Sequence, residues 1–553
     1  RLAEESRRAI QVASVIGREF ALRLLARLTE AGDSVREQVD ELRSLELIYE
    51  KALHPELAYM FKHALTHDVA YESVVVERRR VLHCSIGRVI EEVYADRLAE
   101  HYETLAHHYG RGGDLARALH YHHRSAEKAA EAHANRAVTD HCRAALAIAD
   151  QLGASVADDV RRRLNELLGL ACFHLSEFAA SGAAYEEAAS CSDAAEARSL
   201  NLGAAALSHF WAHRYDTAQR CIGAARAVAR KGGVPAGEAL ALVVRGFYRG
   251  VHDADIEGLE QDLQAAMEIA EREKHELVET FARVYLAMKS EWTGDYASAF
   301  QRAESAIVLG RRLRRPELII FPGWFLAKAR CCTGDFGGAI ALLEEAYHLC
   351  DRIGDRAWKS RLLNTLGWCF AEIGHHDQAR GFNERAAILA REIGDPEILS
   401  NADINLAMNH LELGDVGRAC AYLRPIEEAV SIPGDPWMRW RYAMHVHHAR
   451  GCIELARGNL DEVLASAQAQ LMGAERHRAP KVVGRARTLA ARALIALDRR
   501  QEAEHELREA LAVAERIGHR SGVWEAELQL RELAVRSGDR ARSEQHLGRA
   551  RAA

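Results

Sequence analysis

The chain has 553 residues, of which 48% are hydrophobic and 28% are charged, so it has enough apolar surface to form packed domains. The 73 Lys and Arg against 80 Asp and Glu give a formal net charge of −7, which excludes a global basic field for nucleic acid or anionic lipid. It contains only 9 prolines, where average composition would give about 28, and so few helix breakers exclude β-rich and proline-rich architectures.

The 11 cysteines are scattered and form no C-x-x-C motif, which indicates buried thiols in a reducing compartment. No apolar stretch approaches the roughly 20 residues that a membrane span needs. The first residues, Arg1–Ser6, have neither the apolar core of a signal peptide nor an initiator Met. We therefore expect a cytoplasmic protein without a membrane partner, whose sequence begins inside a longer chain.

Residues 1–95 predict a small domain of three helices followed by a β-hairpin, which is the element order of a winged helix. The expected elements are helices Ser6–Ile16, Ala21–Thr29 and Val35–Leu45, strands 47–50 and 57–61, and a turn through His54, Pro55 and Glu56. Residues 1–100 carry 15 Lys and Arg against 18 Asp and Glu. A DNA-reading wing is expected to be basic, so this balance favours a structural or regulatory winged helix over a DNA reader.

Three motifs in this block carry a family resemblance, and a fourth continues it into the next segment. They are Gln11–Phe20, Phe61–Ser73 and Arg79–His83, followed by Ala106–Tyr109 with Gly113 and Asp114. Together they resemble the junction after the nucleotide-binding module in multidomain signalling ATPases of the STAND type. The likeness is greatest to bacterial proteins that join a class III adenylate cyclase domain, such an ATPase and a tetratricopeptide arm. The resemblance implies ATPase and cyclase segments upstream, with ATP and Mg²⁺ needed only there.

The chain itself contains no G-x-x-x-x-G-K-[ST] phosphate-binding loop, no G-x-S-x-G and no G-x-G-x-x-G after a strand. These motifs supply the backbone amides, the lysine or the nucleophile that nucleotide and acyl chemistry require. We therefore expect this chain to be non-catalytic and to hold no cofactor.

Short glycine-centred turns recur with a constant spacing in the second half of the chain. They lie at Gly294, Gly334, Gly374, Gly414, Gly458 and Gly538, with Asp498 at the equivalent place between the last two. Successive intervals are 40 residues, except 44 between Gly414 and Gly458. One insertion of four residues, near Ile432–Pro436, explains this exception.

Between the turns the apolar residues follow helical spacing, as in Ala339–Tyr347 at i, i+3, i+4 and i+7. Each unit therefore predicts two helices of about 15 residues, with Gly ending the first and Asp starting the second. Pro316, Pro396 and Pro480 occupy equivalent helix starts. Such a hairpin cannot bury its own apolar faces, so consecutive units must stack into a solenoid.

The residues inside the unit resemble the tetratricopeptide repeat. The best copy reads Leu366-Gly367-x-x-Phe370, then Gly374, Ala379 and Ala386. The period exceeds the 34 residues of that family, so the helices are longer. The expected fold is an all-α, tetratricopeptide-like α-solenoid of about 40-residue helical hairpins after a small winged-helix-like domain. The expected domains are 1–95, 96–275 with divergent repeats, and 276–553 with regular repeats.

Transferring the first-helix pattern of the repeat predicts a concave row of aromatic, amide and basic side chains. Its members are Phe281, Met288, Phe321, Trp324, Lys328, Asn364, Trp368, Met408, Arg441, His445 and His448. Such a row suits a peptide or helix, although aromatic residues at helical spacing are also typical of a core. Arg441, His445 and His448 share a helix face that could bind an anionic group, the alternative being an exposed polar face.

Eight of the 28 histidines lie in residues 101–141. His107 and His108 with His120, His122 and His123 could form a metal site across a hairpin. No H-E-x-x-H or Cys/His ligand spacing supports it, and solvated helix faces explain the same pattern. We expect no metal.

These observations favour a sensor and scaffold arm over two other classes. The arm would bind a protein or peptide in its concave groove, or a small effector. It would also contact and regulate an upstream ATPase module by population shift. The alternatives are a transcriptional regulator acting on DNA and a self-contained enzyme. The repeat helix at the C-terminus offers no basic helix-turn-helix, and no catalytic constellation is present.

Overall fold

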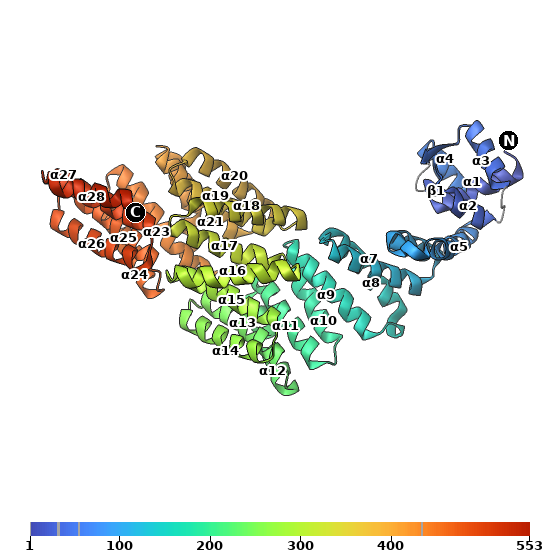
Figure 1. The fold of residues 1–553 in the computed structure, drawn as a ribbon, viewed down its shortest axis with the longest axis horizontal. Helices are drawn as coiled ribbons and strands as arrows, with labels where there is room; N and C mark the ends of the chain where they lie inside the picture. The colour runs from blue at the N-terminus through green and yellow to red at the C-terminus, as the bar shows by residue number, and fades with distance from the viewer. Residues whose placement is uncertain (1, 30–33, 53–55, 433–434) are drawn as a thin grey trace. The chain divides into compact units, whose positions relative to one another are not determined.

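The computed structural model describes residues 2–29, 34–52, 56–432 and 435–553. The chain divides into two compact units, of which unit 1 ends at residue 171 and unit 2 comprises residues 172–553 (Figure 1). The division falls inside one helix, α9. The boundaries expected after residues 95 and 275 rest on the regularity of the repeat and stay predictions.

Unit 1 begins with three helices and a three-stranded antiparallel sheet of order β1-β3-β2. The elements are α1 (Glu4–Ile16), β1 (Glu19–Ala21), α2 (Leu22–Thr29), α3 (Val35–Ser44), β2 (Ile48–Ala52) and β3 (Ala58–Phe61). In the register, Glu19 pairs with Met60 and Ile48 with Phe61. The three helices and the hairpin follow the winged-helix order expected from the sequence, and β1 is an additional short strand. The expected turn residues His54 and Pro55 lie outside the described residues.

The core of this small domain forms where the amphipathic faces of α1, α2 and α3 meet the sheet. Leu25 on α2, Leu42 on α3 and Phe61 on β3 are fully buried in one apolar cluster. Phe20 packs edge-on against Phe61 with ring centroids 5.9 Å apart. Burial of one apolar stripe per helix is what holds three short helices together here.

The rest of unit 1 is helical. Its elements are α4 (Ala64–Glu72), α5 (Val76–Val93), η2 (Ala95–His101), α6 (Tyr102–Gly112), α7 (Leu115–Glu131), α8 (Asn135–Leu152), η3 (Gly153–Ser155) and α9 (Asp158–His174). Helices α6 and α7 form the first hairpin, joined at Gly113 in the left-handed region and Asp114, whose side chain accepts the Arg117 amide.

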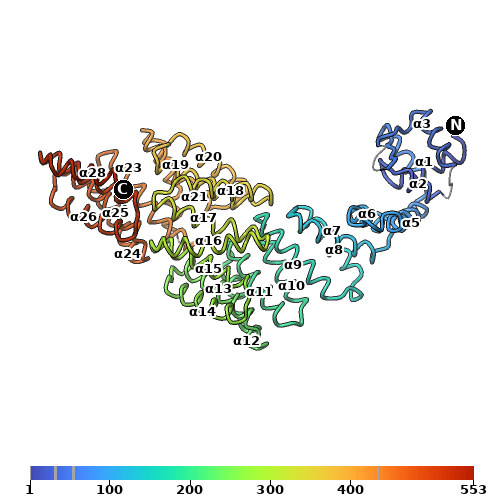
Figure 2. Tube along the Cα trace, viewed as in Figure 1, coloured from blue at the N-terminus to red at the C-terminus, as the bar shows by residue number. Residues whose placement is uncertain are grey.

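Unit 2 is a stack of helical hairpins (Figure 2). Its described elements are α10 (Phe178–Ser190), α11 (Ala195–Trp211), α12 (Tyr215–Gly232), α13 (Pro235–Val251), α14 (Ile256–Arg272), α15 (Glu276–Trp292), α16 (Tyr296–Leu313), α17 (Glu317–Cys332), α18 (Phe336–Ile353), α19 (Arg356–Glu372), α20 (His376–Ile393), α21 (Pro396–Glu412), α22 (Val416–Ser431), η4 (Met438–Tyr442), α23 (Ala443–Arg457), α24 (Leu460–Arg476), α25 (Pro480–Ala496), α26 (Arg500–Ile517), α27 (Arg520–Arg536) and α28 (Arg540–Ala552).

The turns have the chemistry that the sequence predicts. Gly294 has φ +77° and ends the α15 turn in the left-handed region, where a side chain is strained. Asp295 then starts α16 by accepting the backbone amide of Ser298 at 3.2 Å. Asp498, which replaces glycine in the series, also lies in the left-handed region with φ +56°. The predicted helix ends and helix starts are confirmed at these positions.

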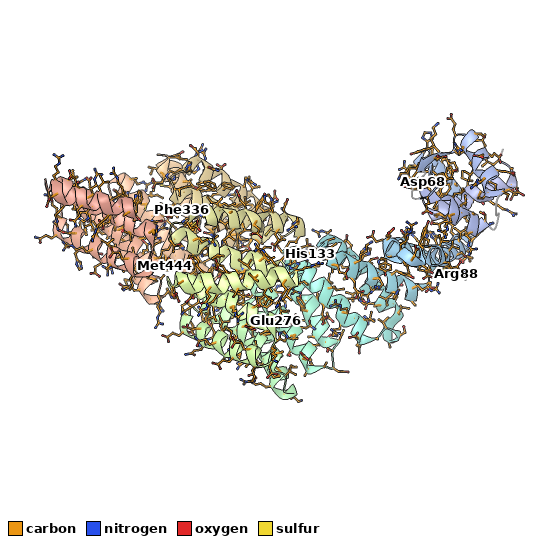
Figure 3. All side chains as sticks on the ribbon, in the orientation of Figure 1. Asp68, Arg88, His133, Glu276, Phe336 and Met444 are labelled. Carbon is orange, nitrogen blue, oxygen red and sulfur yellow. The ribbon has the colours of Figure 1, made fainter. Side chains whose placement is uncertain are left out.

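Burial follows the expected helical stripe. On α18, Ala339, Leu343 and Ala346 are at most 2% exposed and pack in one cluster with residues of α17 and α19. Figure 3 shows the side chains on the ribbon, with Phe336 at the first position of α18. Each helix therefore buries its apolar face against the next hairpin, and the fold is the all-α, tetratricopeptide-like solenoid expected from the sequence. Among the described helices, none combines the length and apolar character that a bilayer crossing requires.

Candidate functional site

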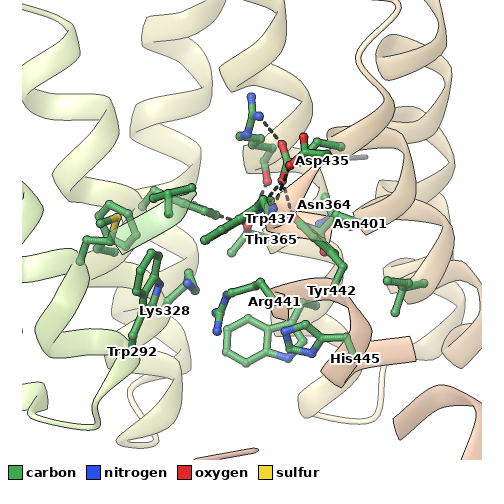
Figure 4. Close-up of a pocket in the computed structure, with 18 of the residues that line it drawn as sticks. Trp292, Lys328, Asn364, Thr365, Asn401, Asp435, Trp437, Arg441, Tyr442 and His445 are labelled. Carbon is green, nitrogen blue, oxygen red and sulfur yellow. Dashed lines mark hydrogen bonds and ion pairs between the residues drawn. The ribbon is translucent and has the colours of Figure 1, made fainter. Parts of the chain in front are cut away.

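A cavity that is partly open to solvent lies on the inner face of unit 2. Most of its wall comes from the first helix of successive hairpins, from α11 through α25. The segment from Asp435 to Tyr442, which contains η4, lines it as well. Figure 4 shows Lys328, Asn364 and Arg441 from three different helical elements around this space, which we call the pocket.

The 40-residue register explains why these side chains converge. Phe321, Arg361 and Asn401 are 40 residues apart, His445 follows after 44, and Arg485 follows after another 40. All five line the pocket. Because stacked repeats present equivalent positions to the same surface, one position of the repeat supplies five neighbouring side chains of different chemistry.

The structure brings most of the sequence-predicted concave residues together. Those that line the pocket are Met288, Phe321, Trp324, Lys328, Asn364, Trp368, Arg441 and His445. Trp324 donates its indole N–H to Thr365 Oγ1 at 2.6 Å, and Asn405 donates to Asn364 Oδ1 at 2.8 Å. The indole and amide groups are thus held in fixed orientations by their neighbours.

Three predicted residues lie elsewhere. Phe281 lines a smaller cavity with Tyr285 and Phe321. Met408 packs into apolar clusters with residues of α22 and α23. His448 is half-buried and faces α24, where its Nδ1 lies 3.4 Å from Gln470 Oε1. Transfer of the pattern therefore included residues that pack between helices rather than face the pocket.

The sequence reasoning missed several pocket residues. They are Trp211, Trp292, Arg361, Asn401, Trp437, Lys481 and Arg485, among others. Adding one period to Phe321 gives Arg361, and adding one period to Arg441 gives Lys481, so the register itself contained that signal. No such signal existed for Trp437, because it lies in the insertion and has no equivalent in the other repeats.

Two of the basic side chains in the pocket wall form buried ion pairs with glutamates. Lys328 Nζ lies 2.8 Å from Glu291 Oε2, and their side chains are 12% and 3% exposed. Burial alone would raise the pKa of Glu291, but Lys328 and the further cations Lys481 and Arg441 hold it below its usual value. Glu291 therefore stays ionised inside the protein.

The second pair joins Arg361 to Glu397, whose side chains are 6% and 11% exposed. Glu397 also accepts a hydrogen bond from the Tyr442 hydroxyl. Burial, followed by the charge of Glu397, raises the pKa of that hydroxyl well above its usual value, so Tyr442 remains a donor. Arg361 Nη1 has no hydrogen-bond partner among the described residues.

Four basic side chains of the wall lie over indole rings. The cation lies 4.7 Å from the ring centroid for Lys328 over Trp324, 5.0 Å for Arg361 over Trp211, 5.3 Å for Arg441 over Trp292 and 4.5 Å for Lys481 over Trp368. Such contacts contribute about 0.5–2 kcal/mol each and orient both partners. The pocket thus alternates aromatic faces with positive charges.

One edge of the pocket is closed by contacts between distant parts of unit 2. Trp440 donates its indole N–H to the Val251 carbonyl at 2.8 Å, across 189 positions. Asp435 lies 3.0 Å from His213 Nδ1 and accepts from the Tyr215 hydroxyl at 2.7 Å. We call these five residues the clasp. It joins the segment Asp435–Trp440 to the turn before α12, to α12 and to α13, so hairpins far apart in the sequence meet directly.

The clasp contains a histidine with a shifted pKa. Burial alone would lower the pKa of His213, but the hydrogen bond to Asp435 and the charge of Asp395 raise it overall above its usual value. Burial would likewise raise the pKa of Asp435, whereas its bonds from His213 and Tyr215 lower it overall. The pair therefore favours an imidazolium beside a carboxylate.

The described part of the chain contains one group of three donors that could hold a metal ion, formed by Glu186, His209 and Cys221. His209 Nε2 lies 3.0 Å from Glu186 Oε2, and Cys221 donates to Glu186 Oε1 at 3.5 Å. The histidines of residues 101–141 instead meet in pairs, such as His122 with His141 at 3.1 Å. The ligand set weighed from the sequence is not assembled there.

Comparisons with known proteins agree with the repeat. Residues 323–392 match the family model described as Tetratricopeptide repeat. A sequence comparison with curated proteins gave no match. Among solved structures, a Rap protein complexed with competence and sporulation factor is similar with a TM-score of 0.51 and 14% identity, over 64% of this chain and 98% of that chain.

Two further structures show weaker likeness. The APC/C hetero-tetramer Cut9–Hcn1 has a TM-score of 0.43 and 15% identity, over 85% of this chain and 93% of that chain. A signal transduction ATPase with numerous domains and a tetratricopeptide repeat sensor, from Pyrococcus horikoshii, has a TM-score of 0.25 and 13% identity. That match covers 100% of this chain and 63% of the other chain.

Proposed function

We propose that this chain is a non-catalytic sensor arm that captures a peptide, a protein segment or a small effector in the pocket. The observation that carries the proposal is the pocket itself, an aromatic wall drawn from helices that are far apart in the sequence. Ligand sites are typically concave, mainly apolar and supplied with a few oriented polar groups. The pocket has this character, with indole rings beside the amides of Asn364 and Asn405.

Capture in this pocket has a mechanical consequence. A ligand that touches α15, α19 and α25 at once adds contacts between hairpins that are far apart in the sequence, beside direct contacts such as the ion pair between Arg485 on α25 and Glu372 on α19. It therefore favours the arrangement of hairpins that fits it, by as much as its affinity differs between arrangements. The arm would report occupancy as a change of curvature or rigidity along unit 2.

We further propose that the arm regulates a nucleotide-binding module in a longer cytoplasmic polypeptide. The support is the resemblance of residues 8–130 to the junction in STAND-type ATPases, including the cyclase-linked ones, together with the winged-helix order of α1 to β3. An in-frame phosphate-binding loop motif encoded within about 300 residues upstream would support this part. A start codon next to Arg1 without such a motif would contradict it.

The experiment on ligand capture uses the uncharged dye phenylnaphthylamine, which fluoresces in apolar sites. We expect the full chain to bind this dye, and we expect energy transfer from the pocket tryptophans to the bound dye. Trp368→Ala removes one ring of the wall and should weaken binding by about tenfold, as loss of a central aromatic contact does. Trp524→Ala is the matched control, because Trp524 is 51% exposed on α27 and does not line the pocket. Equal binding by all three proteins would contradict the proposal.

The alternative function, a transcriptional regulator, is favoured by one observation, the winged-helix order in unit 1. Duplex DNA binding through such a domain depends strongly on salt because phosphate contacts release counterions. Fluorescence anisotropy with a labelled duplex at low salt tests it. We expect no salt-dependent binding, since residues 1–100 carry 15 basic and 18 acidic side chains.

A further inference from the structure

The charge of the pocket is opposite to that of the chain. The chain has a formal net charge of −7. The pocket wall instead carries five Lys or Arg residues and two carboxylates. The carboxylates, Glu397 and Asp435, lie at one end with Arg361, and both are hydrogen-bonded by protein donors. The positive charge is gathered at the other end, around Lys328, Arg441, Lys481 and Arg485.

At this positive end, two of the four cations have carboxylate partners. Lys328 pairs with Glu291, and Arg485 pairs with Glu372 on α19. Burial alone would raise the pKa of Glu372, but Arg485 and then Lys481 lower it to about 2. Both glutamates are therefore ionised and already committed to one cation each.

Arg441 and Lys481 are the two cations without such a partner. Among the described residues, neither forms an ion pair with a carboxylate. Lys481 Nζ lies 3.4 Å from Cys332 Sγ and 4.5 Å from the Trp368 ring centroid. The Arg441 guanidinium lies 5.3 Å from the Trp292 ring and 5.9 Å from the Trp437 ring. Indole faces orient these cations, but they do not neutralise them.

The two residues also occupy equivalent positions in consecutive repeats, because they are 40 residues apart. Stacking therefore aims both side chains at the same part of the pocket. Half-buried cations that lack a counter-charge cost stability through desolvation and mutual repulsion. An anion placed between them would remove that cost, so this end of the pocket is arranged for a negative group.

His445 supports the same conclusion. It lies beside Arg441 in the pocket wall (Figure 4). Burial, and then the positive charges of Arg441, Lys481 and Arg485, lower its pKa well below the usual value. The imidazole is therefore neutral, and it offers a hydrogen-bond donor to an anion without adding another charge.

We propose that the pocket takes a ligand with a carboxylate, phosphate or similar anionic group held between Arg441 and Lys481, and with an apolar or aromatic body against Trp292 and Trp368. This proposal rests on the proposed function, since it names the chemical class of the ligand. Arg441 supplies a planar fork of N–H donors for two oxygens, and Lys481 supplies a compact charge. The tryptophan rings supply the apolar surface.

The experiment compares two dyes that differ by one charged group. Anilinonaphthalene sulfonate is phenylnaphthylamine with a sulfonate added, so the ratio of their Kd values isolates the contribution of the anion. We expect the full chain to bind the sulfonate dye about tenfold more tightly than the uncharged dye at low salt, so the Kd of the uncharged dye divided by the Kd of the sulfonate dye is about ten. This ratio should fall as the salt concentration rises. Arg441→Gln and Lys481→Gln should each lower the preference for the sulfonate dye over the uncharged dye by about fivefold, because each removes one positive charge from the anion site.

Controls separate a lost site from a lost fold. Arg439→Gln is the matched control, because Arg439 lies in the same turn, η4, and is exposed. Arg441→Lys and Lys481→Arg keep the charge and should keep most of the ratio. A ratio near one in the native chain, or a ratio unchanged in both Gln variants, would overturn the proposal while ligand capture stands. Failure of both dyes to bind would instead overturn the proposed function.

Competition distinguishes the two main sources of the anion. Benzoate and phenyl phosphate share an aromatic ring and differ in the charged group. Displacement of the sulfonate dye by benzoate supports a carboxylate ligand, and displacement by phenyl phosphate supports a phosphate ligand. If neither benzoate nor phenyl phosphate displaces the sulfonate dye at the concentrations at which the dye binds, the assignment of this end of the pocket as an anion site is overturned.

Discussion

Gly367 gives the sharpest test of how the repeats pack. It lies inside α19, where Ala would normally be the better helix former. A Cβ at this position would lie 2.3 Å from Asn383 Oδ1 and 2.6 Å from its Cγ. Asn383 is fully buried on α20 and donates to Asn409 Oδ1 at 2.8 Å, so it has nowhere to move without breaking that bond. We therefore expect Gly367→Ala to destabilise unit 2.

The magnitude follows from three opposing contributions. Overpacking of a rigid buried site costs about 1–3 kcal/mol, and loss of a buried hydrogen bond costs about 1 kcal/mol more. The gain in helix propensity from Gly to Ala returns about 1 kcal/mol. The expected net change in the free energy of unfolding is a loss of about 1–3 kcal/mol, which is concentrated at the α19–α20 hairpin.

The assay is thermal unfolding by circular dichroism, combined with hydrogen exchange to localise the change. Gly381→Ala is the matched control, because Gly381 lies inside α20 with no atom within 4 Å of its added Cβ. This variant should be as stable as the native chain or more stable, by up to about 1 kcal/mol. If both variants stabilise the protein equally, the close contact between Gly367 and Asn383 does not exist and the reasoning is refuted.

Three further predictions concern buried charges. Arg361→Met leaves Glu397 without its ion-pair partner and should lower the free energy of unfolding by about 3 kcal/mol in denaturant titrations. The pKa of His213 is raised in the folded chain, so its contribution to stability is present below pH 6.5 and is lost as the pH rises through the folded pKa. Thermal unfolding at a series of pH values should show this loss of stability, and the loss should be smaller in Asp435→Asn. Burial lowers the pKa of His108 to about 3, so the unfolded chain binds a proton there at a higher pH than the folded chain does. The free energy of unfolding should therefore fall by about 1.4 kcal/mol per pH unit as the pH drops below 6.5. Unfolding followed by circular dichroism should show a smaller fall in His108→Gln.

Each of these predictions has a control and a contrary result. For the ion pair, Arg356→Met removes an exposed arginine from the same helix and should change stability by less than about 0.5 kcal/mol. A similar loss in both arginine variants would argue against a buried pair. For the clasp, unchanged pH dependence in the Asn variant would show that His213 is not stabilised by the carboxylate. For His108, a native acid response in the Gln variant would assign that response to other groups.

The periodic features of the fold were readable from the sequence because they depend on local chemistry. Gly294 and Asp295 mark a turn through backbone geometry and a capping bond, and neither requires a distant partner. The stripe of Ala339, Leu343 and Ala346 is equally local, since a helix repeats every 3.6 residues. The strand β1 has only 3 residues and gives no such pattern, so it was not foreseen.

The pocket was only partly readable, for two physical reasons. Charged residues such as Arg361 and Glu397 are usually solvated, and only the structure shows that they are buried against each other. Closure of the pocket depends on contacts between hairpins that are far apart in the sequence, and the stacking of all the hairpins between them brings them together. Asp435 lies in the insertion and Trp440 lies just after it, and nothing local to them indicates partners on α12 and α13.

The clasp can form only late in the synthesis of the chain, because its two sides are far apart in the sequence. Val251 and Trp440 are separated by 189 positions, and chains are made at about 5–20 residues per second, so about 10 to 40 seconds pass between their appearances. During that interval α11 and α13 are complete, while the segment from Asp435 to Tyr442, which lines the same pocket as Phe210 and Phe247, has not been made. The aromatic wall is then open to other chains and to chaperones. Phe210 and Phe247, which line the pocket, are thus made well before the segment that closes one edge of it.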